Sequence, residues 1–139
     1  MGLDQFWLKT KEEVNMEALN YRYYDEGFTE KDEDLQHIES CKLKEFYYHR
    51  KVPALEDFMA NEFDKQLLDV TFNDRHLRVT RELLNELQKC VKEKSLNEEA
   101  SGFFWGHHCA ADYEDIQGAI DAANKLLDEG YDIYYLSSW

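Results

Sequence analysis

Hydrophobic residues recur at helical spacing in three segments of the chain, which predicts three amphipathic helices. The first helix follows Pro53, a residue that the first turn of a helix tolerates, and extends to about residue 66. Its apolar positions are Leu55, Phe58, Met59 and Phe63, followed by Leu67.

The second and third helices carry end signals as well as apolar faces. Thr80 can cap the second helix, whose apolar face holds Leu83, Leu84, Leu87, Cys90 and Val91. We expect Asp112 to cap the third helix and Gly130 to follow its last turn in the C′ position. The inner face of the third helix holds Ile116, Ala119, Ile120, Ala123, Leu126 and Leu127.

Short aromatic segments between these helices predict β-strands. The candidate strands are residues 3–8, 43–50, 70–72, 102–106 and 131–136. Segment 43–50 forms a strand or leads into a helix, and a turn at Asn73-Asp74 follows segment 70–72. Because consecutive residues of a strand face opposite sides, we expect at least one of Tyr134 and Tyr135 to face solvent. The pattern predicts an α+β fold, with about three helices packed on a small sheet of short aromatic strands.

Residues 11–40 are the most polar part of the chain and hold ten acidic residues. Tyr21, Tyr23, Tyr24 and Phe28 interrupt the acidic residues, so we expect a partly ordered excursion rather than a free tail. With one proline and six glycines, the chain contains no Pro/Gly-rich linker. We therefore expect residues 1–139 to form one complete compact domain.

The chain has 30 Asp and Glu against 16 Lys and Arg, a formal charge of −14 at neutral pH. This charge argues against direct binding to a nucleic-acid backbone, which needs Lys and Arg to displace counterions. The acidity is concentrated in residues 12–39 and after residue 95, where Lys125 is the single base against nine acids. An aromatic content of 14% argues against global disorder.

The sequence also indicates the cellular compartment. No apolar run approaches the roughly 20 residues that a membrane span requires, so we expect no membrane association. The N-terminus lacks the basic and apolar regions of a secretory signal. Three widely spaced cysteines, Cys41, Cys90 and Cys109, are typical of reduced thiols. We expect a cytoplasmic protein.

His107, His108 and Cys109 form the densest group of potential metal ligands. The paired spacings of structural zinc sites are absent, so the remaining ligands would have to come from elsewhere in the fold. The alternative is a structural loop in which one histidine donates to a backbone carbonyl and Cys109 packs as a small apolar side chain. We expect neither a metal nor another cofactor.

The same loop is also the candidate catalytic site. Cys109 precedes the third predicted helix, whose N-terminus would lower the thiol pKa, and His107 or His108 could act as its base. His49 is a further candidate across a cleft. Adjacent residues seldom point at each other, however, and no signature of a cysteine hydrolase is present, so enzymatic activity is not our first expectation.

Candidate binding residues fall in two groups. Tyr48, His49, Arg50 and Lys51 form a basic island beside aromatic residues, which could hold a phosphate or a base, or simply balance nearby carboxylates. Tyr134, Tyr135 and Trp139 could contribute to a partner-binding patch, because interfaces favour Tyr and Trp. No glycine-rich phosphate loop is present.

Four blocks, in order, resemble a family of small bacteriophage and prophage proteins. They are Gly2-Leu3-Asp4, Tyr48-His49-Arg50-Lys51, Gly102-Phe103-Phe104-Trp105-Gly106 and Tyr134-Tyr135-Leu136-Ser137-Ser138-Trp139. That family begins Met-Gly-Leu-Asp, ends Ser-Ser-Trp and often has Trp where this chain has His49. The resemblance implies a phage-related origin and a location in the cytoplasm of a host cell, but it supplies no activity and no catalytic residues.

Three functional hypotheses remain. The first is a non-enzymatic interaction protein that modulates a host factor or defence system, with a host or phage protein as its partner. The second is a DNA mimic, whose carboxylates occupy the groove of a nucleic-acid-binding protein. The third is a small enzyme or metal-binding protein that uses His107, His108 and Cys109. The oligomeric state cannot be inferred from the sequence.

Overall fold

The computed structural model describes residues 2–21, 25–66, 71–101 and 105–139 as an α+β domain. The described strands are β1 (Asp4–Thr10), β2 (Lys44–Arg50), β3 (His76–Val79) and β4 (Asp132–Ser138). The described helices are α1 (Met16–Asn20), α2 (Glu30–Ser40), α3 (Pro53–Gln66), α4 (Arg81–Glu93) and α5 (Asp112–Asp128). Within these ranges, no helix is both long and apolar enough to cross a lipid bilayer.

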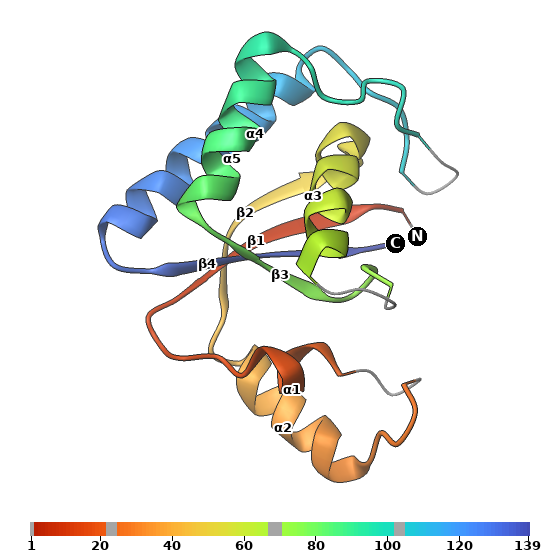
Figure 1. Cartoon of the computed structure of the whole chain (residues 1–139), viewed down its shortest axis with the longest axis vertical. Helices are drawn as coiled ribbons and strands as arrows, with labels where there is room; N and C mark the ends of the chain where they lie inside the picture. Colours follow the sequence, from red (N-terminus) through yellow and green to blue (C-terminus); the bar gives the residue numbers. More distant parts are fainter. Residues whose placement is uncertain (1, 22–24, 67–70, 102–104) are drawn as a thin grey trace.

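The strands form one antiparallel sheet in the order β2-β1-β4-β3, with helices on both faces (Figure 1). Helices α3, α4 and α5 cover one face and enclose the main hydrophobic core, which includes Trp7, Leu55, Phe63, Leu84, Ile120 and Tyr135. The much smaller α1–α2 unit lies on the opposite side of the sheet. The prediction of an α+β fold is confirmed.

The three helices predicted from apolar spacing are present as α3, α4 and α5. The hydroxyl of Thr80 caps α4 by accepting from the N–H of Leu83 at 3.2 Å. Gly130 follows α5 with φ +91°, and its N–H donates to the carbonyl of Leu127, as a left-handed C′ residue allows. Asp112, by contrast, is the first helical residue of α5 rather than its N-cap, because its carboxylate turns back to accept from the N–H of Cys109.

Helices α1 and α2 replace the partly ordered excursion expected between residues 11 and 40. A reciprocal capping box starts α2, in which Thr29 and Asp32 each accept from the other's backbone N–H. Tyr23 and Tyr24 lie outside the described residues. The described residues thus form five helices, whereas about three were expected. Polar surface helices lack the regular spacing of apolar residues from which helices are predicted.

Two strand predictions need correction. The strand expected at residues 70–72 is wrong in position, because β3 begins only at His76, after the turn at Asp74, whose φ is +64°. Phe72 instead contacts Phe63 in the core, with ring centroids 4.7 Å apart, and Val70 lies outside the described residues. Of the strand expected at 102–106, residues 102–104 also lie outside the described ranges, and Gly106 makes only an isolated bridge.

The prediction that Tyr134 or Tyr135 faces solvent is wrong. Tyr135 is fully buried on the side of α3–α5, and Tyr134 is 1% exposed. The α1–α2 unit lies on the side of the sheet opposite to α3–α5, where the pattern predicted solvent (Figure 1). All three cysteines are free thiols in this structure.

Candidate functional site

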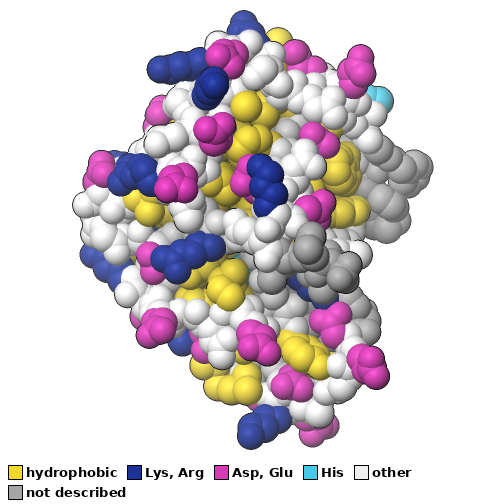
Figure 2. Space-filling model, in the orientation of Figure 1, with side chains coloured by type: hydrophobic (Ala, Val, Ile, Leu, Met, Phe, Trp, Pro, Cys, Tyr) yellow, Lys and Arg dark blue, Asp and Glu magenta, His cyan; other side chains and the backbone are white. Residues whose placement is uncertain are grey.

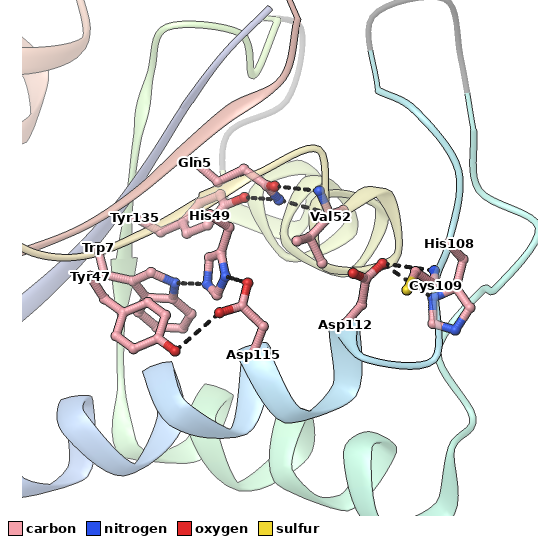
Figure 3. A network of polar contacts seen from close by, with 10 residues as sticks. All are labelled: Gln5, Trp7, Tyr47, His49, Val52, His108, Cys109, Asp112, Asp115 and Tyr135. Carbon is pink, nitrogen blue, oxygen red and sulfur yellow. Dashed lines mark hydrogen bonds and ion pairs between the residues drawn. The ribbon is translucent and has the colours of Figure 1, made fainter.

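His49 is buried between the sheet and α5, with both ring nitrogens engaged (Figure 3). The indole N–H of Trp7, on the neighbouring strand β1, donates to His49 Nε2 at 2.9 Å. On the other side of the ring, His49 Nδ1 lies 2.6 Å from Asp115 Oδ2 on α5. The side chain of His49 therefore links two strands to a helix.

These contacts define the protonation state of His49. An indole nitrogen only donates, so Nε2 must accept, and the proton of a neutral imidazole then lies on Nδ1, where it is donated to Asp115. Burial lowers the pKa of His49 from its ordinary value, although the charge of Asp115 opposes the effect. Protonation would place two N–H groups face to face and break the bond from Trp7.

Asp115 connects this buried network to the surface. Its second carboxylate oxygen accepts from the Tyr47 hydroxyl at 3.1 Å, and its side chain is 41% exposed. A shallow hollow of about 390 Å³ lies beside it, lined by Glu45, Phe46, Tyr47, Tyr48 and Asp115. A group in this hollow would meet the carboxylate of Asp115 but not the imidazole of His49, whose side chain is fully buried.

A second buried network centres on Glu56, in the first turn of α3. Its two carboxylate oxygens accept from the hydroxyls of Tyr135 and Ser137, both at 2.7 Å. Gln5 continues the network, because its amide N–H group donates to the Tyr135 hydroxyl and to the carbonyl of Val52, both at 2.9 Å. The network joins β1, β4 and α3.

Burial raises the pKa of Glu56 from 4.5 to about 7, because the hydrogen bonds from Ser137 and Tyr135 only partly offset the loss of solvation. Burial, together with the charge of Glu56, also raises the pKa of the Tyr135 phenol well above its ordinary value. Trp7 packs edge-on against Tyr135, with ring centroids 5.6 Å apart, so the two networks adjoin. Their polar atoms are satisfied by one another, which stabilises the fold rather than offering groups to a substrate.

The remaining residues of the predicted basic island are on the surface. Tyr48 is 42% exposed and donates its hydroxyl to Asp4. Arg50, 55% exposed, lies 3.7 Å from the same carboxylate. Lys51 is exposed and has a positive φ of 56°. The buried His49 is thus separated from its three neighbours in sequence and does not form one site with them.

The predicted aromatic patch is not assembled on the surface. Tyr134 and Tyr135 are buried on opposite sides of β4. Trp139 is partly buried and packs edge-on against Trp105, with ring centroids 5.5 Å apart. Its backbone N–H and carbonyl both pair with the side-chain amide of Asn73, which holds the end of β4 against the turn before β3.

The loop of His107, His108 and Cys109 precedes α5 and lies apart from His49 in Figure 3. His108 Nε2 is 3.1 Å from Glu98 Oε1, so its partner is a carboxylate rather than the backbone carbonyl that we expected of a structural loop. Cys109 is exposed, and the expectation that it packs as an apolar side chain is wrong. Across the described ranges, no three His, Cys, Asp or Glu side chains are grouped to hold a metal ion.

The sequence carries signals for the buried polar residues. Gln5 alternates with Leu3 and Trp7, so it belongs to the buried side of β1. Glu56 is three residues before Met59 and therefore lies on the apolar face of α3. A polar residue in register with a buried stripe indicates an internal hydrogen-bond network.

Helix α2 is the main unusual feature of the surface. None of its residues is buried, and it exposes two large apolar side chains, Leu35 at 42% and Ile38 at 56%. Figure 2 shows many acidic side chains over the α1–α2 unit, with hydrophobic side chains among them. The helix is attached through polar contacts, such as the bond that Gln36 donates to the carbonyl of Leu19 at 3.1 Å.

Comparisons with known proteins add no assignment. No family model, curated protein or solved structure matches the chain. Its function is therefore inferred from its own residues and their geometry.

Proposed function

We propose that the protein is an acidic, phage- or prophage-type cytoplasmic protein that acts by binding a host or phage protein rather than by catalysis. The resemblance of its sequence blocks to small phage proteins supports the origin. The surface of the α1–α2 unit supports the mode of action.

The observation that carries this proposal is α2, an ordered helix that buries none of its residues. Most helices in proteins are stabilised by packing an apolar face against the core. In α2 the apolar side chains Leu35 and Ile38 face solvent instead, within an acidic surface. Covering them with a partner would remove apolar area from water, which favours association.

The described residues give less support to catalysis. Both nitrogens of His49 are engaged by Trp7 and Asp115, so its imidazole is not free to move a substrate proton. His108 faces the carboxylates of Glu98 and Asp112, at 3.1 and 3.7 Å, rather than the thiol of Cys109. A nucleophile and base within hydrogen-bond reach, the usual sign of covalent catalysis, is not formed by these groups.

DNA mimicry is a narrower form of the same proposal. It would require carboxylates alone to make the contacts, as phosphates do. The exposed Leu35 and Ile38 have no counterpart in a phosphate backbone, so the surface of α2 fits a protein partner that offers apolar as well as basic groups.

Affinity capture with the full-length chain from phage-infected host cells, followed by direct binding to each purified candidate, tests the proposal. The informative variant is Leu35→Ser with Ile38→Ser, which removes apolar surface without disturbing the core. We expect it to weaken the direct complex at least about tenfold.

Tyr48→Ser is the matched control, because Tyr48 is the other large hydrophobic residue exposed in the described ranges and lies on β2. We expect this variant to bind normally. If no purified candidate binds saturably, the proposal is wrong. If Tyr48→Ser abolishes binding while the α2 variant binds normally, the binding surface is the edge of the sheet and not α2.

A further inference from the structure

A groove of about 850 Å³ lies between α2 and the sheet. Its outer wall is α2, which contributes Ile38 together with Asp34 and Glu33. The facing wall is formed by Asp74 in the turn before β3 and by Leu136 on β4. Apolar side chains thus stand on both walls, with carboxylates beside them.

The backbone of His76, at the edge of the sheet beside the groove, is already paired. Asn20, at the end of α1, accepts from the backbone N–H of His76 at 2.7 Å and donates to its carbonyl at 2.9 Å. One buried side-chain amide therefore satisfies the backbone of His76, at the start of β3, where a visiting strand would otherwise pair. Beside His76, an occupant of the groove therefore binds through its side chains rather than by pairing with the backbone.

The charge of the groove is one-sided. Three carboxylates line it, from Glu33, Asp34 and Asp74, beside the imidazoles of His37 and His76, and none of the described lining residues is Lys or Arg. The overall charge of −14 adds to the attraction that a cationic group would feel on approach. The apolar side chains of Ile38 and Leu136 offer a complementary anchor point above the buried Leu19.

We propose that this groove binds a basic segment of a partner protein, with an aliphatic side chain between Ile38 and Leu136 and Lys or Arg side chains on Asp34 and Asp74. The inference rests on the proposed function, since it names the surface and the chemistry of the partner. An apolar anchor flanked by charges is also the usual layout of an interface, with an apolar centre and a polar rim.

The first test selects ligands without assuming their chemistry. A random 12-residue peptide library displayed on yeast is sorted against the full-length chain, and the most enriched peptide is synthesised. We expect enriched peptides to combine Lys or Arg with a Leu, Ile or Met. In a ¹⁵N correlation spectrum, the synthetic peptide should shift the amides of Ile38, Asp74 and Leu136 most.

The second test separates the groove from general attraction to an acidic protein. Asp34→Asn with Asp74→Asn removes one carboxylate from each wall, and Asn tolerates the positive φ of position 74. Glu82→Gln with Glu86→Gln removes the same charge from an exposed part of α4. We expect the first pair to weaken peptide binding about fivefold and the second less than twofold.

Ile38→Ser supplies the apolar arm of the test, and we expect it to weaken peptide binding about tenfold. Equal losses from the two charge pairs would show attraction to the whole acidic surface and overturn the inference. Enriched peptides that lack basic residues would overturn it as well, as would a library without enrichment. One outcome separates this inference from the proposed function. If a captured partner protein binds the Leu35 and Ile38 double variant more weakly but binds the Asp34 and Asp74 double variant normally, the proposed function stands and the inference that the groove binds a basic segment is refuted.

Discussion

Replacing Glu56 by Gln should abolish one pH-dependent component of the stability of this protein. Glu56 is fully buried in the structure, and burial raises its pKa from 4.5 to about 7. Between these two values the folded state binds a proton that the unfolded state has released. The stability contributed by this group is therefore complete below about pH 4.5 and is lost as the pH rises to about 7.

The size of this effect follows from the pKa shift. A shift of one pKa unit corresponds to about 1.4 kcal/mol, so the shift from 4.5 to about 7 corresponds to about 3 kcal/mol. Gln resembles the protonated acid, because it accepts at one atom and donates at the other. Between pH 4.5 and 8, the wild type should thus lose about 3 kcal/mol of unfolding free energy relative to Glu56→Gln.

Urea denaturation followed by circular dichroism, at intervals of half a pH unit, measures this difference directly. Taking the difference between two proteins cancels the titration of the groups that they share. Glu62→Gln is the matched control, since it makes the same substitution on the same helix at a residue that bonds to Lys65 near the surface. A flat curve for Glu56→Gln would show that Glu56 titrates normally and that the reasoning from its burial is wrong.

Two further predictions concern the His49 network. Because the pKa of His49 is lowered in the folded state, its contribution to stability is present above pH 6.5 and is lost as the pH falls below that value. In urea denaturation, His49→Gln should lack this loss of unfolding free energy at acidic pH. The same dependence of unfolding free energy on pH in variant and wild type would contradict the prediction. Gly118→Ala places a Cβ against the hydroxyl of Tyr47 and displaces it from Asp115, which opposes the gain of about 1 kcal/mol in helix propensity. We expect a net destabilisation of about 1 kcal/mol in the same assay, against no more than about 0.5 kcal/mol for the exposed control Ala110→Ser.

The main helices could be predicted because their local signals agree with their tertiary roles. In α4 the cap at Thr80 and the apolar face of Leu83, Leu84 and Leu87 all lie within a few residues of one another. Helix α2 has a cap of comparable quality at Thr29, but no buried residue. Without an apolar face, only its capping box distinguishes it from a polar loop, and periodicity alone cannot reveal it.

The candidate site was harder to predict because its partners are far apart in the sequence. His49 bonds to Trp7 and Asp115, which are 42 and 66 residues away. These pairs exist because β1 lies beside β2 and α5 crosses that face of the sheet, and neither neighbour is specified by local pattern. The sequence therefore identified His49 as a candidate but grouped it with Arg50 and Lys51 in one basic island.

The two sides of the sheet differ in how far their side chains are enclosed. On the side of α3–α5, the polar groups of His49 and Glu56 are enclosed and paired, so changes there alter the free energy of folding. On the other side, Ile38 is exposed and Leu136 lines an open groove, so both remain available to a second molecule. Buried and hydrogen-bonded side chains gain little from a second molecule, whereas exposed apolar side chains are removed from water when a partner covers them. We therefore expect the proposed binding on the side of the α1–α2 unit.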